Sequence, residues 1–488
     1  MKSLAKNSVY NIVYQLLSLI FPLLSSMYVA RIIFEDGVGR VAYAQNFVSY
    51  FVALALLGFP TYGIREIAKV KEDRKKINIT FWELFLINAI STTLSSFVYI
   101  IALIYSDYFR NQLSLYVCVG VTLWVNFANI DWFYQGKEEY GYITVRSLAI
   151  KAISLICLVL LVKQKEDYIV YALISSCGTV CNYILNLIHA RKYISFNFKL
   201  KKLNLKRHLK PLMILAIAAF LGNVYSKIDV TMLGSLSNDA VVGYYTNAHK
   251  IILIMVSCCI AVTSVFLPRL SFYYENDRTA LEKLINFGTK LLITIVVPAT
   301  ICIGMLATST MKILYGASFA KAGTTLAIFA PLLLIRPIGD LLCYQLIVSA
   351  GKEKKRIYTS LIATISNIIL NWILIPRWQQ NGAAVASIIS EFIVNVLLLH
   401  EVIRIVKINL DKFFLLKVLF SSAFMVLAII GIKHIFNNEF LILLLSVFIG
   451  SGIYLLVNYL IKNEIVLDIY KRFMKLRKNK CFGNSNKS

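Results

Sequence analysis

Long apolar segments recur along the whole chain and are separated by short polar ones. The hydrocarbon core of a bilayer is about 30 Å thick, so a helix needs about 20 mostly apolar residues to cross it. This criterion predicts about fourteen spanning helices, at residues 9–31, 41–64, 81–105, 113–133, 145–163, 167–189, 211–233, 244–268, 287–311, 323–349, 356–376, 382–403, 413–435 and 438–461. The pattern therefore predicts an all-α integral membrane protein.

Basic residues alternate between the polar segments in a way that predicts the orientation of the chain. With the N-terminus inside, the inner segments carry 36 of the 51 Lys and Arg residues and the outer segments carry nine. Lys and Arg accumulate on the cytoplasmic side of membrane proteins. We therefore predict that both termini are cytoplasmic and that residues 462–488 form a basic cytoplasmic tail.

The composition narrows the class of protein further. Hydrophobic residues make up 58% of the chain and charged residues 16%, and the net charge is +26. In a soluble chain this charge would favour a nucleic-acid partner, but here the basic clusters lie between apolar segments, so we expect no nucleic acid. The nine Cys and five His residues show no metal-ligand spacing, so we expect no metal and no cofactor. With no catalytic motif and no large loop, the chain is not expected to be an enzyme.

The chain matches itself at two offsets. At an offset of 204, Gly39 aligns with Gly243 and Arg65 with Arg269; at an offset of 215, residues 136–138 align with residues 351–353, both Gly-Lys-Glu. Chance alignment of loop glycines is the alternative. Parallel repeats of six helices are typical of transporters with a site at the repeat interface. The predicted domains are an N-terminal lobe at 1–206, a C-terminal lobe at 207–407, helices 13 and 14 at 408–461, and the tail.

Three cations lie inside predicted spans and are the candidate substrate-binding residues, lining a cationic cavity: Lys227, Lys250 and Arg336. A charge within the bilayer is costly unless it faces protein or water. The alternatives are that the two lysines extend to the membrane surface and that Arg336 pairs with Asp340, four residues later on the same helical face.

Three carboxylates in the same spans are the candidate ion-coupling residues: Asp229, Asp340 and Glu391. Asp229 lies two residues from Lys227, roughly 200° around a helix, so the two cannot pair directly. Glu391 has no basic residue one turn away and is a candidate proton or cation site. The alternative is a structural Glu391 that is protonated or paired with a distant residue. The aromatic residues near span ends, among them Tyr105, Tyr108, Tyr134, Tyr244 and Tyr245, are expected to form an interfacial belt.

Three motifs carry a resemblance to a known family. They are residues 129–136 (NIDWFYQG) with 138–140, residues 58–66 (GFPTYGIRE), and residues 227–229 (KID) with 232–234 and 242–245 (VGYY). The chain resembles the Wzx-type oligosaccharide repeat-unit flippases of the multidrug/oligosaccharidyl-lipid/polysaccharide (MOP) exporter superfamily.

The resemblance implies a V-shaped bundle of two six-helix lobes plus two C-terminal helices, located in the bacterial cytoplasmic membrane. It implies transfer of an undecaprenyl-diphosphate-linked oligosaccharide from the inner to the outer leaflet by alternating access. It also implies a lipid-tail groove near helices 13 and 14, coupling to proton or sodium gradients, and cooperation with a polysaccharide polymerase and chain-length machinery. The alternatives are a cation-coupled multidrug exporter of the same fold, a membrane polysaccharide polymerase, and a passive scaffold.

Overall fold

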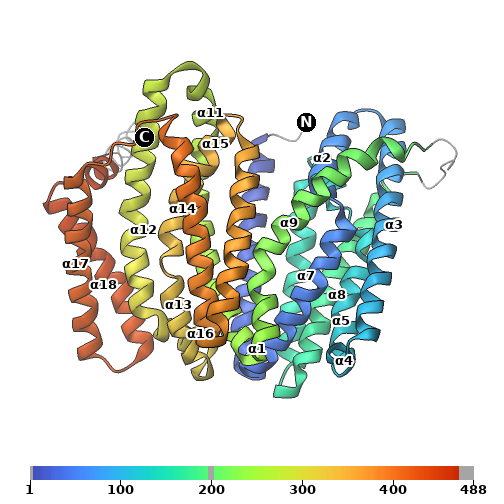
Figure 1. The fold of residues 1–488 in the computed structure, drawn as a ribbon, viewed down its shortest axis with the longest axis horizontal. Helices are drawn as coiled ribbons and strands as arrows, with labels where there is room; N and C mark the ends of the chain where they lie inside the picture. Colours follow the sequence, from blue (N-terminus) through green and yellow to red (C-terminus); the bar gives the residue numbers. More distant parts are fainter. Residues whose placement is uncertain (1–3, 196–202, 472–488) are drawn as a thin grey trace, which may run out of the picture. The chain divides into compact units, whose positions relative to one another are not determined.

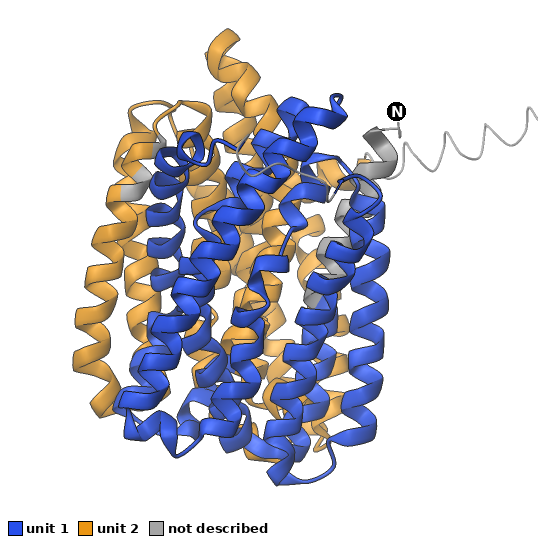
Figure 2. Ribbon diagram, turned by 90° about the vertical axis from the view of Figure 1, so that its right-hand side faces the viewer, with its two compact units in different colours: residues 1–246 blue, residues 247–488 orange. Residues whose placement is uncertain are grey.

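The computed structural model describes residues 4–195 and 203–471 (Figure 1), and every regular element in these ranges is helical. The chain forms two compact units, residues 1–246 and 247–488 (Figure 2). The predicted boundary after residue 206 follows the sequence repeat and remains a prediction, whereas the first compact unit also includes the next long helix. Most of the predicted basic tail, residues 472–488, lies outside the described residues.

The first unit is built around one long helix, α1, which packs against α3, α5, α7, α8 and α9. Its elements are α1 (Leu4–Leu56), α2 (Phe59–Val70), α3 (Arg74–Tyr105), α4 (Asp107–Arg110), α5 (Leu113–Trp124), η1 (Asn126–Ala128), α6 (Asp131–Gly136), α7 (Tyr140–Leu161), η2 (Lys165–Asp167), α8 (Tyr168–Ala190) and α9 (Lys206–Leu236). Helix α10 (Asp239–Thr263) begins in this unit and continues into the second.

In the second unit the long helix α12 packs against α11, α13, α14, α17 and α18. The elements are η4 (Ser264–Phe266), α11 (Leu267–Asn276), α12 (Arg278–Tyr315), η5 (Ala317–Lys321), α13 (Ala322–Phe329), α14 (Leu332–Gly339), the π-helical segment η6 (Asp340–Gln345), α15 (Leu346–Ser349), α16 (Glu353–Ile403), α17 (Lys412–Ile435) and α18 (Glu439–Leu460).

The described helices include eleven that are long and apolar enough to span a membrane. Two of these are double passages with a bend in the middle, at Phe34 (φ 55°) in α1 and at Gln379 (φ 48°) in α16. Both bends fall between two predicted spans, and the shorter apolar segment Leu113–Ala128 accounts for another. The structure is thus consistent with about fourteen passages, and the chain is a multi-pass membrane protein.

Helix α3 illustrates how the chain is adapted to lipid. Its large apolar side chains are exposed, including Leu94 at 63% and Phe97 at 64%, whereas Asn88, Ser91 and Thr92 are buried. Ser91 donates a hydrogen bond to the Ala55 carbonyl at 2.6 Å. An exposed apolar face with buried polar groups that hydrogen-bond to neighbouring helices is the arrangement expected in a bilayer.

The offset of 204 recurs in the structure at two helix N-termini. Asp73 caps α3 by accepting hydrogen bonds from the Lys75 and Lys76 N–H groups, and Asp277 caps α12 in the same way. The Lys76 N–H is the main cause of a lowered pKa of the Asp73 carboxyl. At Asp277 the Thr279 hydroxyl, followed by the Ala280 N–H, lowers the pKa. Both repeats therefore start their third predicted span with the same capping interaction.

The predicted aromatic belt is partly wrong. Tyr105 is 82% and Tyr108 42% exposed, but Tyr134, Tyr244 and Tyr245 are buried. Their hydroxyls hydrogen-bond to groups inside the first unit, among them the Asn186 carbonyl, which accepts from Tyr134 at 2.6 Å. Position near a span end did not distinguish these internal tyrosines from interfacial ones, because it contains no information about which face of the helix they occupy.

Candidate functional site

The two lysines among the predicted binding residues lie within long apolar helices. Lys227 is on α9 in the first unit and Lys250 is on α10 in the second, and each is half-buried. Neither ammonium group forms an ion pair or a hydrogen bond with a described residue. Since a membrane-embedded charge is costly without a partner, both groups are suited to bind an anion.

Asp229, by contrast, is bound within the first unit. The Tyr245 hydroxyl on α10 donates to Asp229 Oδ2 at 2.6 Å. Two residues further along α9, Thr231 Oγ1 accepts a hydrogen bond from Asn46 Nδ2 at 2.8 Å and lies 2.7 Å from the Tyr50 hydroxyl, both on α1. The carboxylate does not pair with Lys227, in agreement with their helical spacing.

The second unit brings Arg336 and Glu391 together. Arg336 Nε on α14 lies 3.3 Å from Glu391 Oε2 on α16, and the side chains are 24% and 17% exposed. Glu391 is therefore paired with a residue of another helix, and its role in ion coupling stays a prediction. The local sequence could not reveal this pair, because Arg336 and Glu391 lie on different helices and are 55 residues apart in the chain.

Asp340 begins the π-helical segment η6, directly after a proline-containing turn. Its Oδ2 accepts a hydrogen bond from Gln345 Nε2 at 2.8 Å. Pro337 lacks a backbone donor, which disturbs the regular helical bonding. At Gly339 an added Cβ would collide with Asn395 Oδ1 on α16, so these two helices are in close contact. π-helical segments frequently occur at functional sites.

The first unit holds a buried charged cluster that the sequence analysis missed. Arg146 on α7 is 6% exposed; its Nη2 lies 3.1 Å from Asp131 Oδ1, and its Nε donates to Asn182 Oδ1 at 3.1 Å. Asn186 Nδ2 also donates to Asp131, at 2.6 Å. Arg146 lies at the very start of the predicted span 145–163, and nothing in its local sequence indicated a buried partner. Asp131, inside the NIDWFYQG motif, was the available signal for a buried partner.

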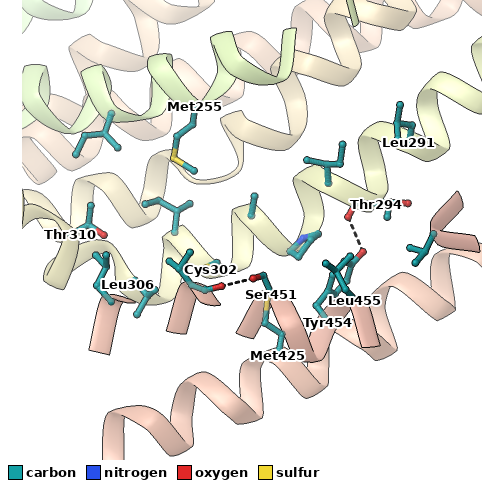
Figure 3. A pocket seen from close by; sticks show the side chains of 18 of the residues that line it. Met255, Leu291, Thr294, Cys302, Leu306, Thr310, Met425, Ser451, Tyr454 and Leu455 are labelled. Atoms are coloured by element: carbon teal, nitrogen blue, oxygen red, sulfur yellow. Dashed lines mark hydrogen bonds between the residues drawn. The ribbon is translucent and has the colours of Figure 1, made fainter. Parts of the chain in front are cut away.

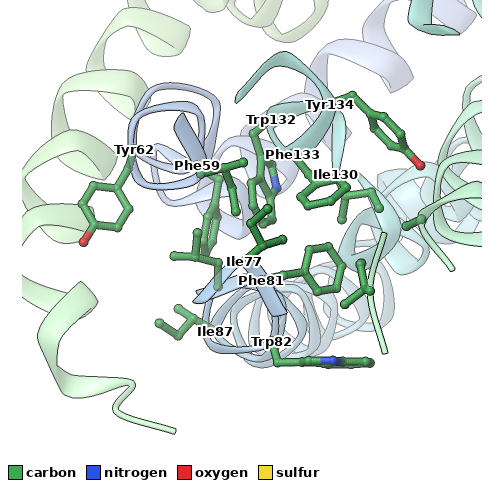
Figure 4. Packing of buried hydrophobic residues seen from close by; sticks show 14 of the residues in the cluster. Phe59, Tyr62, Ile77, Phe81, Trp82, Ile87, Ile130, Trp132, Phe133 and Tyr134 are labelled. Atoms are coloured by element: carbon green, nitrogen blue, oxygen red, sulfur yellow. The ribbon is translucent and has the colours of Figure 1, made fainter. Parts of the chain in front are cut away.

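Two of the three motifs pack against each other (Figure 4). The Phe59 and Trp132 rings stack with centroids 6.1 Å apart, and Phe81 stacks on the other side of Trp132 at 5.9 Å. An added Cβ at Gly63 would lie 2.7 Å from the Trp132 ring, and one at Gly136 would lie 2.8 Å from Ile67. The aromatic and glycine residues of these motifs therefore join α2, α3 and α6.

A long apolar cavity of about 580 Å³ lies within the second unit (Figure 3). Its walls come from α10, α12, α17 and α18 and include Met255, Cys302, Met425 and Leu455. The lining of α12 runs from Leu291 to Thr310, about 28 Å at 1.5 Å per residue. That length is close to the thickness of the hydrocarbon core. We call this cavity the apolar groove.

Two repeat-equivalent segments contact each other within the first unit: the part of α1 directly after its bend at Phe34, and the start of α10. Arg40 Nε donates to Asp239 Oδ2 at 3.0 Å, and the Tyr244 hydroxyl donates to Glu35 Oε1 at 3.1 Å. In each pair, an acidic residue of one repeat binds a residue of the other repeat. The two acidic residues are 204 positions apart in the sequence, and so are Arg40 and Tyr244. We call this arrangement the reciprocal contact.

Two glycines allow the backbones to approach at the reciprocal contact. An added Cβ at Gly39 would collide with the Asp239 carbonyl oxygen, and one at Gly243 would collide with the Glu35 carbonyl oxygen. The sequence comparison had aligned these two glycines. Four residues before these glycines, the same offset relates Glu35 to Asp239. One residue after them, it relates Arg40 to Tyr244. The sequence repeat therefore contained all four residues of the two polar pairs.

The chain is similar in sequence and in fold to known transport proteins. It is 22% identical over 399 residues to a protein of Escherichia coli (strain K12) that is named as an O-antigen transporter, covering 81% of this chain and 96% of that one. Its fold is similar to the lipid II flippase MurJ in an inward closed conformation, with a TM-score of 0.72, 16% identity, and 94% of this chain and 99% of that chain covered.

A second similar structure is an inward-facing multidrug resistance MATE family transporter of the MOP superfamily, with a TM-score of 0.62, 14% identity, and coverage of 79% and 94%. The family model described as "Polysaccharide biosynthesis protein" matches residues 4–273, which is more than half of the chain. The proteins it resembles here are named as transporters and flippases and not as enzymes, and its fold is the one seen in MurJ and the MATE transporter. The chain belongs to the polysaccharide biosynthesis protein family.

Proposed function

We propose that this protein flips an undecaprenyl-diphosphate-linked oligosaccharide from the inner to the outer leaflet of the bacterial cytoplasmic membrane, for surface polysaccharide biosynthesis. The observation that carries the proposal is the pair of ammonium groups, Lys227 and Lys250, that lie in apolar helices without a partner among the described residues. A diphosphate offers several anionic oxygens and forms charge-assisted hydrogen bonds with such groups. An organic cation, the substrate of the alternative exporter, would be repelled by them.

The apolar groove is consistent with a substrate that carries a polyprenyl tail. A polyprenyl chain is long and apolar, and the groove offers an apolar surface along about 28 Å of α12. Binding the tail there would bury hydrocarbon against Met, Leu and Ile side chains without exposing a polar group of the protein. The head group then remains the only part that needs a polar path.

Alternating access requires contacts that can form and break, and the reciprocal contact has suitable chemistry. Arg40 is 40% and Asp239 23% exposed, so the pair has little of the strength of a buried ion pair. If both termini are cytoplasmic, as we propose from the distribution of basic residues, this contact closes the outer side of the path.

The three carboxylates remain the candidates for coupling to a proton or sodium gradient. Each one is already engaged, Asp229 with Tyr245, Asp340 with Gln345, and Glu391 with Arg336. A coupling ion would therefore have to replace or share an existing partner. Glu391→Gln tests this in proteoliposomes: loss of the dependence on imposed pH or sodium gradients supports coupling at Glu391, and an unchanged dependence removes it from the candidates.

The central experiment measures flipping of the lipid-linked oligosaccharide in proteoliposomes. Lys227→Met and Lys250→Met should each slow flipping about tenfold or more, since charge-assisted hydrogen bonds contribute about 1.5–3 kcal/mol. The matched control is Lys290→Met, because Lys290 also lies on a long helix but is paired with Glu464 at 2.9 Å. Equal flipping by all three variants would contradict the proposal.

A deletion strain separates the proposal from its alternatives. Accumulation of the lipid-linked intermediate on the inner leaflet supports flipping. A change in polymer length without accumulation would indicate a polymerase, and intact surface polysaccharide would indicate a scaffold. In the same strain, co-purification tests the expected association with a polymerase and the chain-length machinery.

A further inference from the structure

The first unit contains a second cavity, of about 330 Å³, with a different chemical character from the apolar groove. It lies among α1, α5 and α8 and is lined by ten residues. Seven of them carry a hydroxyl or amide group, and none is charged: Gln45, Ser49, Thr122, Ser175, Ser176, Thr179 and Tyr183. The other three are valines. We call this cavity the hydroxyl pocket.

Some of these polar groups are already satisfied by their own helices. Ser49 Oγ donates to the Asn46 carbonyl at 2.6 Å, and Thr122 Oγ1 donates to the Val119 carbonyl at 2.8 Å. Thr179 Oγ1 likewise donates to the Ser175 carbonyl at 3.2 Å. These hydroxyls can still accept a hydrogen bond from a ligand, but they do not need one.

Three other groups make no hydrogen bond with any described residue, namely the Gln45 amide and the hydroxyls of Ser176 and Tyr183. Ser176 is 2% exposed, so its side chain is almost entirely enclosed. A polar group enclosed in this way is nearly always hydrogen-bonded, so the Ser176 hydroxyl calls for an explanation, whereas Gln45 is exposed and borders the cavity. The three groups come from α1 and α8 and line one cavity, which provides a place for a ligand with several hydrogen-bonding groups.

The chemistry of the hydroxyl pocket selects a class of ligand. With no charged lining residue, it gives neither a diphosphate nor a metal ion the compensation that a charge requires. Hydroxyl and amide groups beside Val48, Val52 and Val119 match a sugar ring, which has polar edges and apolar C–H faces. The volume lies at the small end of ligand pockets, as a single ring requires. We infer that the hydroxyl pocket binds one neutral sugar residue of the transported oligosaccharide.

This inference rests on the proposed function, and it can be tested with two ligands in proteoliposomes. The first is the lipid-linked oligosaccharide extracted from the producing strain, whose KM for flipping is measured. The second is undecaprenyl diphosphate without sugar, measured as a competitor. Ser176→Ala and Tyr183→Phe each delete one hydroxyl and little volume. Ser226→Ala is the control, because the Ser226 hydroxyl donates to the Gly222 carbonyl of its own helix, outside the pocket.

Each pocket variant should raise the KM for the sugar-bearing substrate about two- to tenfold, the range expected for one neutral hydrogen bond. The inhibition constant of the sugar-free competitor should not change, and neither should the KM of the control variant. Equal effects on both ligands would overturn the inference, because the pocket would then act on a part that the two ligands share. No effect on either would also overturn it and indicate that the pocket holds only water. If the wild-type protein does not flip the lipid-linked oligosaccharide, the proposed function itself fails. Gln45→Met, at an exposed position, provides a third variant should Ser176→Ala fail to fold.

Discussion

Glu391→Gln provides a quantitative test of how the interior of the second unit binds an anion. The substitution keeps the size of the side chain and removes the charge that faces Arg336 at 3.3 Å. In the wild-type protein the Glu391 carboxylate is paired with the Arg336 guanidinium. A diphosphate must therefore compete with Glu391 to bind Arg336. The variant removes that competitor and leaves Arg336 without an ionised partner on α16.

The energy of the Arg336–Glu391 pair can be bounded from the distance between the two groups and from their exposure. At 3.3 Å and an effective dielectric constant of about 20, the attraction between two unit charges is about 5 kcal/mol before desolvation. Fully buried pairs cost about 3–5 kcal/mol when one partner is removed, and exposed pairs about 0.2–1 kcal/mol. With exposures of 24% and 17%, this pair lies between the two, at about 1–3 kcal/mol. That corresponds to about five- to 150-fold tighter binding of a diphosphate that can reach Arg336.

The assay combines binding and stability in detergent. Glu391→Gln should bind undecaprenyl diphosphate more tightly than the wild-type protein, and its thermal unfolding midpoint should be lower without the ligand and rise more on adding it. Arg336→Gln combined with Glu391→Gln should recover the stability but not the binding. The control is Glu464→Gln, which neutralises the exposed partner of Lys290. A lower stability with unchanged diphosphate affinity would refute the reasoning and assign the pair a purely structural role.

Three further predictions test the packing and the reciprocal contact. Gly63→Ala should lower the free energy of unfolding by about 1–3 kcal/mol through overpacking, because its Cβ would lie 2.7 Å from a tryptophan ring. Gly222→Ala is the control, because that position has open space around it, and it should not lower the stability in the same thermal unfolding assay. Because the pKa of Asp277 is lowered in the folded state, its contribution to stability is present above about pH 4 and is lost as the pH falls through the folded-state value. Asp277→Asn should therefore weaken the loss of stability in acid, measured by unfolding midpoints from pH 7 to pH 3. Gly243→Val should abolish flipping while the protein still inserts and binds substrate, because the side chain prevents close approach of the backbones; normal flipping would exclude a role of this contact in transport.

The spanning helices were predictable because each depends on a local property, the length of an apolar segment. The bends at Phe34 and Gln379 also fell where two predicted spans met. Interhelical partners were not predictable in this way. Arg146 lies at the start of a predicted span and had no expected partner, yet the fold buries it against Asp131 on another helix. The sequence predicted the type of element well, but a single chain contains no direct record of which helices face each other.

The internal repeat was the exception, because it relates residues that are far apart in the sequence. An offset derived from two glycines, Gly39 and Gly243, also relates the acidic residues Glu35 and Asp239 of the reciprocal contact. Symmetry-related positions tend to meet near the axis that relates two halves, so the repeat carries long-range information that hydropathy does not. The acidic residue is thus repeated in both position and charge, whereas the side chains that complete the two pairs, Arg40 and Tyr244, share only their position.

The third motif shows how a family signature and a binding site can be separated. Asp229 and Tyr245 of this motif bind each other at 2.6 Å, Gly234 packs against the Tyr43 ring, and Gly243 permits the backbone contact. These four residues are thus accounted for by interactions inside the first unit. Lys227 is the ionisable residue of the motif that has no ion pair or hydrogen bond with a described residue. Since an unpaired ammonium in a spanning helix is costly, its presence is explained best by a ligand, and an anionic head group is the ligand that its charge selects.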